Sequence, residues 1–468
     1  MLSHDETDVR TVFRPPAPTP LPTMPGLVQL LRTLHRNPLE CWSKEFFEQP
    51  IVRIRLPFLE AVLVHDPVAI KHVLVDNAES YRKDPIQRRI LAAGLGDGLL
   101  SVEGQQWELQ RRTLAPLFAR RTVSSFSDVM LRVTDALCDR WRGLKAHGTV
   151  DVAQEFTLLT LHMLAVTIFS DGIGSDFNAF SAAMNDYFDA LGRIGVLDLL
   201  GAPDYVPRPG RKRLRKALGY FEEVIDEIIA VRRRRLDRVT DTEAPNDLLT
   251  LLLRVPDPAT GRPLSPKEVR ANILTFLSAG HETTANALTW ATFLLSQSPH
   301  WYERVRAEAD VALDGDRNGL LEQLVLTRAV IEEALRLYPS IAALSRVPEC
   351  TDAIGEIRVH PGSLIVIAPY VLHRHRCLWN EPDLFDPARF LAPARTGIPR
   401  YAYLPFGAGP RTCIGSSFAL QEATLVLAKL VQQFEMQLAP ATKVWPVQKI
   451  TLRPANGLPM RITPRSNA

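Results

Sequence analysis

The spacing of hydrophobic and polar residues divides the chain into a short strand-forming part, a long helical part and a second strand-forming part. Residues 51–56 alternate between apolar and charged side chains, and an apolar run at 61–64 follows, which predicts a β-hairpin. From about residue 66 to about 340 the spacing is mostly helical. Strand-like runs return at 356–359 and 363–367, another helix is expected near residue 413, and β-structure is expected after about 433. The pattern therefore predicts a mainly α fold with a smaller β portion.

The clearest single element is a helix over residues 265–298. It begins with Ser-Pro-Lys-Glu, a capping box with proline at the first helical position, and Ser298-Pro299 ends it. At 1.5 Å per residue it is about 50 Å long, the width of a whole domain. A membrane-spanning interpretation fails because polar and charged residues interrupt it, namely Arg270, Asn272, His281 and Glu282. We expect a central buried helix.

The N-terminal stretch is predicted to be an arm rather than a domain. Residues 1–25 are rich in proline, which favours an extended, poorly ordered segment. Length alone allows about three domains, but no linker follows this arm, so residues 26–468 are expected to form one domain. The stretch lacks the pattern of a signal peptide, and its longest apolar run, 26–31, is too short to span a bilayer. No integral membrane segment is expected.

Composition excludes several classes of protein. The chain has 55 basic and 52 acidic residues, a near balance that argues against nucleic acid as the main partner. Its five cysteines are scattered and form no CxxC, which argues against a disulfide framework or a four-cysteine zinc site and favours a reducing, cytoplasmic compartment. Two basic runs, 211–216 and 232–235, are interpreted as a solvated helix face, with a membrane-surface or partner patch as the alternative.

The most informative stretch is residues 406–415, Phe-Gly-Ala-Gly-Pro-Arg-Thr-Cys-Ile-Gly. It is predicted to be a glycine-rich turn that leads into a helix from 417 to about 435. A cysteine at the start of a helix is favoured as the thiolate. Gly409 and Gly415 allow the backbone to approach a bulky group. A phosphate loop is excluded because no Lys-Ser or Lys-Thr follows the glycines, but a cysteine beside glycines is by itself more often a buried structural residue.

This stretch resembles the haem-binding signature of the cytochrome P450 family, F-x-x-G-x-R-x-C-x-G. Every fixed position is filled, by Phe406, Gly409, Arg411, Cys413 and Gly415. The resemblance implies that Cys413 ligates the iron of haem b, that Phe406 packs near its sulfur and that Arg411 pairs with a haem propionate. A thiolate ligand donates electron density to the iron and favours O–O cleavage.

Residues 279–284, Ala-Gly-His-Glu-Thr-Thr, lie within the predicted central helix. A glycine there costs about 1 kcal/mol relative to alanine, and threonine can bond a preceding carbonyl and bend the helix, so we expect a local distortion. A metalloprotease helix is excluded because H-E-x-x-H needs a second histidine where Ala285 stands. The stretch resembles the P450 pattern (A/G)-G-x-(D/E)-T-(T/S). The resemblance implies that Ala279 and Thr283 face the distal side of the haem, that Thr283 holds dioxygen and water, and that Glu282 relays protons.

Two charged motifs extend the resemblance. Glu333 and Arg336 form an E-x-x-R pair on one helix face, for which an ordinary surface ion pair of little energetic value is the commoner explanation. In P450s this pair joins an arginine from an F-x-P-x-R-F segment, here 385–390, so the resemblance implies a structural triad with Arg389. Trp107 and Arg111 share a helix face and resemble the family's W-x-x-x-R helix, which binds a haem propionate; taken alone, they would be a routine packing pair.

The remaining expectations come from the resemblance as a whole. Arg346 lies where the family places another propionate arginine. Arg112, Arg120 and Arg121 make a basic face on which an electron donor of the ferredoxin or flavodoxin type is expected to dock. The expected pocket segments are largely apolar, which suits a fatty acid, terpenoid or aromatic substrate; they are 95–100, 177–199, 276–279, 341–344 and 455–459.

The implied activity is that of a monooxygenase. One oxygen atom from O2 enters a C–H or C=C bond of a hydrophobic small molecule, and the other leaves as water. The alternatives are an isomerase or peroxygenase on the same fold, which often lacks the acid–threonine pair, a haem-binding sensor or carrier without turnover, and an unrelated protein with chance motif matches.

Overall fold

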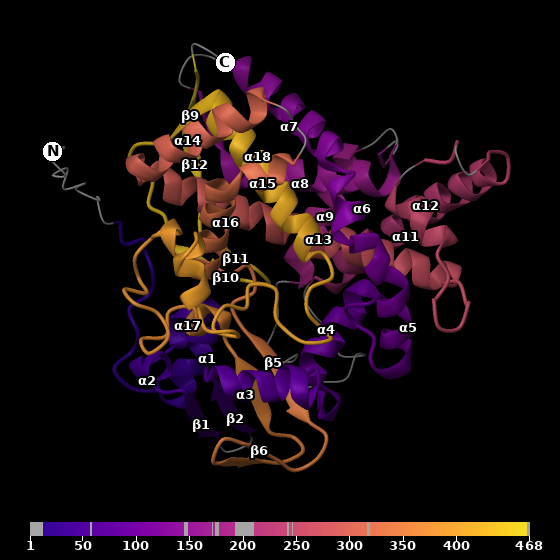
Figure 1. Cartoon of the computed structure of the whole chain (residues 1–468). Helices are drawn as coiled ribbons and strands as arrows, with labels where there is room; N and C mark the ends of the chain where they lie inside the picture. Colours follow the sequence, from indigo (N-terminus) through magenta and orange to yellow (C-terminus); the bar gives the residue numbers. More distant parts are fainter. Residues whose placement is uncertain are drawn as a thin grey trace, which may run out of the picture.

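The computed structural model describes residues 13–56, 59–144, 148–170, 172–173, 177–191, 210–240, 243–245, 247–315 and 319–465. Helices make up the bulk of the molecule and strands a smaller part, with the largest sheet at the bottom of Figure 1. The predicted mainly α fold with a smaller β portion is therefore confirmed. The helices are α1 Leu27–Arg36, α2 Lys44–Glu48, α3 Pro67–Lys71, α4 Pro85–Leu95, α5 Gly104–Leu114, α6 Arg120–Ser124, α7 Ser127–Arg142, α8 Val152–Phe169, α9 Phe177–Leu191, α11 Arg211–Leu236, α12 Leu248–Arg254, α13 Pro266–Ser296, α14 Pro299–Asp314, α15 Leu320–Gln323, α16 Val325–Leu337, α17 Pro369–Leu372 and α18 Ser416–Gln433.

The largest sheet contains the predicted hairpin. Strands β1 (Ile51–Leu56) and β2 (Leu59–Val64) pair antiparallel, with Ile51 opposite Val64. Strand β8 (Leu364–Ile367) lies parallel to β2, β5 (Leu344–Pro348) pairs antiparallel with β8, and β3 (Tyr81–Arg82) closes the edge. Strand β5, which carries Arg346, is therefore paired with β3 at residues 81–82, although the two strands are far apart in the sequence.

The predicted β-structure after residue 433 is also confirmed. Strand β9 (Phe434–Leu438) follows α18 directly and pairs with β12 (Pro459–Pro464), which also pairs with β4 (Thr149–Asp151). Two further antiparallel pairs are short, namely β10 (Pro446–Gln448) with β11 (Leu452–Pro454), and β6 (Asp352–Ile354) with β7 (Ile357–Val359).

Helix α13 is the central buried helix that the sequence predicts. The Ser265 hydroxyl accepts from the N–H of Glu268, and the Glu268 carboxylate accepts from the N–H of Ser265, so the capping box is formed. Helix α13 packs along α8, and a Cβ atom on Gly280 would come within 2.8 Å of a methyl group of Leu164 on α8. The glycine is therefore explained by helix packing as well as by the neighbouring motif.

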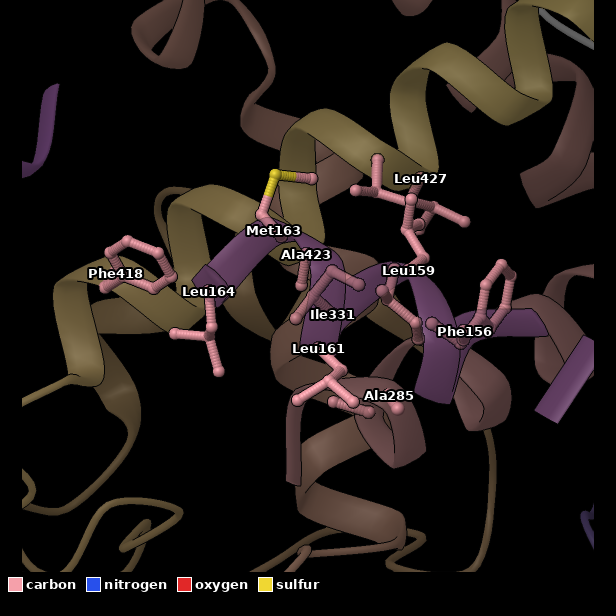
Figure 2. Packing of buried hydrophobic residues seen from close by; sticks show 14 of the residues in the cluster. Phe156, Leu159, Leu161, Met163, Leu164, Ala285, Ile331, Phe418, Ala423 and Leu427 are labelled. Carbon is pink, nitrogen blue, oxygen red and sulfur yellow. The ribbon is translucent and has the colours of Figure 1, made fainter. Parts of the chain in front are cut away.

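The core beside α13 is formed by α8 and α18. In Figure 2, side chains of α8 such as Met163 and Leu159 lie against Ala423 and Leu427 of α18, while Leu161 points toward Ala285 of α13. Among the described residues, α8 alone has the length and hydropathy of a membrane-spanning helix, and most of it is buried inside the protein. Its apolar character is therefore accounted for by the core.

Of the proline-rich arm, the structure describes residues 13–25, which lie outside any helix and are held against the domain. The ring of Phe13 packs edge-on against Phe293 at 5.9 Å, and the carbonyl of Phe13 accepts a hydrogen bond from the N–H of Phe385. The hydroxyl of Tyr338 donates to the carbonyl of Pro16 across 2.7 Å. The expectation of poor order is thus wrong for residues 13–25, because buried aromatic and hydroxyl groups hold the arm against the domain.

The second basic run also differs from its favoured interpretation. Arg232 of α11 is buried, and its guanidinium donates to both carboxylate oxygens of Asp247 at 2.6 Å and to the carbonyl of Phe169 at 2.7 Å. Its neighbours Arg233 and Arg234 are exposed. Only part of this run is a solvated face, because Arg232 ties α11 to the segment that precedes α12.

Candidate active site

The loop before α18 is held in a fixed shape by its own backbone. The N–H of Cys413 donates to the carbonyl of Phe406 at 2.9 Å, and the N–H of Thr412 donates to the carbonyl of Gly409 at 3.0 Å. Gly407 and Gly409 have φ angles of 71° and 72°, a region that favours glycine. A Cβ atom on Gly409 would lie 1.8 Å from the carbonyl oxygen of Leu74, so no other residue fits without moving the backbone. The loop therefore holds Cys413 in a fixed position.

The side chain of Cys413 is accessible to solvent, although protein surrounds it closely. Its side chain is exposed, yet surrounding protein removes enough water that burial raises the pKa of the thiol; the Gly415 backbone and the nearby Arg111 charge lower it. Both properties hold for a side chain that lines an interior space. The sequence predicts a thiolate favoured by the helix start, but burial has the larger effect on the pKa of the thiol. A Cβ atom on Gly415 would lie 4.0 Å from the sulfur, so this glycine keeps that side of the thiol open.

The stretch of α13 that carries the acid–threonine pair likewise has accessible residues within buried surroundings. Residues 271–278 and 284–295 are buried throughout, whereas Ala279 is exposed and Thr283, one turn later, is partly exposed. The Thr283 hydroxyl donates to the carbonyl of Ala279 at 2.7 Å, as expected for a threonine that bonds the preceding turn. Helix α13 also packs against α18. Between residues 271 and 295, the accessible surface of the central helix is thus restricted to Ala279, Gly280 and Thr283, which lie within the motif that the sequence singles out.

A cluster of cations lies beside this region. Burial, followed by repulsion from Arg411 and Arg346, lowers the pKa of Lys83 to about 8. Burial, followed by repulsion from Arg411, lowers the pKa of Arg346 to about 10. Burial also lowers the pKa of Arg411 and of Arg111. Glu103 is the acid that opposes this effect at Lys83, Arg346 and Arg411, so the cluster carries surplus positive charge.

Two of the expected propionate ligands contact each other directly. The guanidinium of Arg411 lies 4.3 Å from the ring centre of Trp107, within the range of a cation–π contact. Arg411 also forms an ion pair with Glu103. Arg111 lies on α5 one turn after Trp107, close enough to Cys413 that each alters the pKa of the other. The structure therefore brings Trp107, Arg111, Arg346, Arg411 and Cys413 into one region, as the resemblance implies.

These residues fit a haem. An interior thiol that faces an accessible space supplies an axial ligand for iron. The surplus charge of Lys83, Arg346 and Arg411 suits a group with two carboxylates, because buried cations are costly unless they are paired. The accessible strip of Ala279 and Thr283 leaves room beside α13 for a flat ligand. The donor set and the charge thus agree with a porphyrin that carries two propionates.

The acid of the central helix is held from the C-terminal part of the chain. The hydroxyl of Thr451 donates to Oε1 of Glu282 at 2.8 Å, and Nδ2 of Asn286 donates to the same hydroxyl oxygen at 3.0 Å. A guanidinium nitrogen of Arg453 lies 3.7 Å from the same carboxylate oxygen. Glu282 is buried whereas Arg453 is exposed, so this network leads from the interior toward the surface.

The charged triad is formed as expected. Arg336 donates to both carboxylate oxygens of Glu333, at 2.6 and 2.7 Å, and both side chains are fully buried. A nitrogen of Arg389 lies 3.6 Å from Glu333. Arg336 also donates to the carbonyls of His373 and Pro382, at 2.8 and 2.7 Å. The ordinary surface ion pair is excluded, because this charge pair fastens α16 to the irregular segment before the cysteine loop.

No pattern in the sequence points to four residues of the site, namely Lys83, Glu103, Thr451 and Arg453. None belongs to a motif, and each reaches the site only because the fold brings a distant segment to it. A lysine beside a short strand, or Thr-Leu-Arg in a C-terminal tail, gives no local signal. The run 451–453 alternates polar and apolar positions, which predicts a strand but not the buried acid that the strand contacts.

The predicted docking face and the predicted pocket segments are each only partly supported by the described residues. Of the predicted basic docking face, Arg112, Arg120 and Arg121 are exposed, but Arg112 pairs with Asp257 at 3.1 Å and is partly neutralised. Among the predicted pocket segments, Leu100, Ile341 and Ala279 are exposed. Residues 192–199 of that prediction lie outside the described part.

Comparison with known proteins finds one family model and several relatives that match most of this chain. The family model described as "Cytochrome P450" matches residues 15–459. Cyclooctatin synthase of Streptomyces melanosporofaciens is 32% identical over 437 residues, covering 92% of this chain and 91% of that protein. Pentalenene oxygenase of Streptomyces avermitilis is 30% identical over 455 residues, covering 95% and 97%.

The same likeness holds for the fold. The crystal structure of the cytochrome P450DA heme domain superposes with a TM-score of 0.81 at 26% identity, covering 96% of this chain and 98% of that one. The likeness therefore extends over nearly the whole chain and is not confined to the cysteine loop.

Proposed function

This chain belongs to the cytochrome P450 family and is a haem-dependent monooxygenase acting on hydrophobic substrates, and from that premise we propose how its residues divide the work. We propose Cys413 as the axial ligand. The observation that supports it best is its place on a rigid loop, with an accessible thiol enclosed by protein. Phe406 packs beside the sulfur and Gly415 leaves it uncovered. When bound, the haem supplies the activation of dioxygen, which no side chain can perform.

The cofactor in this proposal is haem b, and the cation cluster orients it. Arg411, Arg346, Lys83 and Arg111 bind the two propionates together with the indole N–H of Trp107. The pair between Arg411 and Glu103 is expected to loosen when a propionate takes the place of the glutamate. The pKa of Lys83 is lowered to about 8, first by burial and then by repulsion from Arg411 and Arg346, and this supports the role because an anion at the site would favour the charged ammonium.

Thr283 and Glu282 are the proposed catalytic residues. The Thr283 hydroxyl lies on the accessible strip of α13 and donates back to the Ala279 carbonyl, so its oxygen can accept a hydrogen bond from a water. To hold dioxygen, the hydroxyl would turn from that carbonyl and donate to the dioxygen. Glu282 is the proton relay, with its carboxylate steadied by Thr451 and with Arg453 between it and solvent. A relay needs an acid that is fixed inside the protein but connected to water, and this network meets both conditions.

The electrons come, in this proposal, from a separate cytoplasmic ferredoxin or flavodoxin-type protein. The exposed Arg120 and Arg121 offer positive charge for an acidic donor, and electrostatic complementarity mainly speeds such an encounter. Residues 26–468 are proposed to act as one haem domain that follows the N-terminal arm of residues 1–25, and the described part of that arm, residues 13–25, packs on it.

The substrate is proposed to be a terpenoid, with a fatty acid or an aromatic compound as the other candidates. The supporting facts are the apolar character of the pocket segments and the names of two relatives, Cyclooctatin synthase and Pentalenene oxygenase. A hydrophobic pocket rejects close analogues weakly, so several cyclic hydrocarbons are expected to bind.

The test is reconstitution of the holoenzyme. Cyclic terpenoids, fatty acids and aromatic compounds are first screened for a substrate-induced shift of the haem band. Those that bind are incubated with NADPH, a ferredoxin and its reductase. The proposal expects a product that gains one oxygen atom from labelled O2. Turnover with hydrogen peroxide alone, equal to that with NADPH, would favour a peroxygenase, and binding without turnover would favour a sensor or carrier.

A further inference from the structure

Helix α1 exposes an apolar strip that the fold does not cover. Leu27, Leu31 and Leu34 follow the i, i+4, i+7 spacing of one helix face and are 41%, 48% and 36% exposed. Val28 beside them is 64% exposed, and Leu30 alone in this helix is buried. A surface helix usually turns its leucines inward, so this orientation needs an explanation.

An exposed tryptophan lies next to this helix. Asn37, where α1 ends, donates to the carbonyl of Pro446 at 3.0 Å and accepts from the N–H of Gln448 at 3.1 Å. The residue before Pro446 is Trp445, which is 39% exposed. Of the eleven exposed large hydrophobic side chains among the described residues, four thus lie on α1 and a fifth lies on the segment bonded to its C-terminal end. We call these five the α1 patch, namely Leu27, Val28, Leu31, Leu34 and Trp445.

The surroundings of the α1 patch are basic. Arg32, His35 and Arg36 lie on α1 beside the leucines, and Lys443 and Lys449 flank Trp445; all five are exposed. The sequence has no acidic residue between positions 9 and 39, nor between 436 and 468. Glu40 follows, and its carboxylate is already paired with Arg36. The patch is thus apolar with a positively charged border.

We propose that the α1 patch is a docking surface for an anionic lipid bilayer, with the leucines and Trp445 entering the interface and the cations binding lipid headgroups. An amphipathic helix with leucines on one face and basic residues beside them has the composition of an interfacial helix, and tryptophan favours the boundary between acyl chains and headgroups. Each cation near an anionic membrane contributes about fivefold to binding. A ten-residue helix with four apolar side chains implies reversible, peripheral association. This inference does not depend on the proposed reaction.

The experiment is flotation of the purified holoprotein with vesicles. One set contains phosphatidylglycerol and phosphatidylcholine in equal amounts, and the other phosphatidylcholine alone, at low and at high salt. Wild type is expected to float with the anionic vesicles at low salt, and less at high salt. The triple variant Leu27→Ser, Leu31→Ser, Leu34→Ser should bind about tenfold or more weakly, with an unchanged haem spectrum.

Two further variants separate the contributions. Arg32→Gln with Lys443→Gln and Lys449→Gln should lose most of the preference for anionic lipid. The matched control Val311→Ser with Val325→Ser removes side chains that are 75% and 53% exposed outside the patch and should bind as wild type does. The proposal is overturned if wild type floats with neither vesicle, or if the leucine variant floats equally well. Dimers in size-exclusion chromatography that the leucine variant abolishes, without vesicle binding, would instead assign the patch to a second copy.

Discussion

The hydroxyl of Thr451 lies 2.8 Å from Oε1 of Glu282 and donates a hydrogen bond to it, although the two residues are 169 positions apart. The carboxylate of Glu282 is therefore held in place by a residue outside its own helix, α13. The segment before β11 does so, and Asn286 orients the Thr451 hydroxyl in turn.

Thr451→Val keeps the shape of the side chain and removes the donor. A hydrogen bond to a charged group contributes about 1.5–3 kcal/mol, so the carboxylate of Glu282 should lose its fixed position. We expect product formed per NADPH to fall about fivefold or more, while haem content stays normal. Thr451→Ser restores a hydroxyl and should recover most of the coupling. Equal coupling in the valine variant would mean that Thr451 only packs beside the acid.

Thr283→Ala tests the other member of the acid–threonine pair. Without the hydroxyl, water and dioxygen are no longer held beside α13, so reduced oxygen should leave as hydrogen peroxide. Cysteine ligation should survive because Cys413 is mounted on a different element. The measurement is the ratio of product to NADPH, with peroxide determined in parallel. An unchanged ratio would contradict the role of Thr283 and favour the peroxygenase or isomerase alternative.

Glu333→Ala and Arg336→Ala should each yield little soluble holoprotein. Each leaves one fully buried charge unpaired, which costs about 3–5 kcal/mol. The matched control is Arg328→Ala on the same helix, which removes a 45% exposed partner of Glu332 and should change the unfolding free energy by about 1 kcal/mol or less. Thermal unfolding and haem content are measured for all three. A melting temperature like that of wild type in either triad variant would show that the pair does not stabilise the fold.

Gly409→Ala and Gly407→Ala separate backbone strain from close contact. Both glycines have a left-handed conformation, in which alanine costs about 1–2 kcal/mol. Only at Gly409 would the new methyl group collide with backbone, the carbonyl of Leu74, whereas nothing lies within 4 Å at Gly407. We expect Gly409→Ala to lose haem and Gly407→Ala to keep it. Equal haem content in the two variants would show that the loop moves more easily than its hydrogen bonds imply.

The sequence predicted those parts of the fold that local patterns specify. The capping box at Ser265 and the proline after it fix where α13 begins, and the alternation at 51–56 fixes the register of the hairpin. The cysteine loop was predictable because glycines, arginine and cysteine must stand at fixed spacing to hold one shape. These features depend on neighbours within one turn or one loop.

The rest depends on contacts between distant segments. Arg232 stands in a run of four arginines, and only the position of Asp247 decides that it is the buried one. Lys83 and Glu103 become part of the site because β3 and the start of α5 approach the arginine before the cysteine. Similarly, the proline-rich arm looks loose in sequence, but a tyrosine hydroxyl, one aromatic contact and a backbone hydrogen bond hold its described part. Tertiary contacts of this kind leave no periodicity in the chain.

The measurement that tests the account most directly is the reduced-CO spectrum of Cys413→Ala. The matched control is Cys350→Ala, which removes an exposed cysteine outside the site. The account predicts that the control keeps the thiolate-type band of wild type and that Cys413→Ala loses it, whatever haem it still holds. A thiolate-type band in Cys413→Ala would contradict the assignment of Cys413 as the axial ligand and, with it, the arrangement of the whole site.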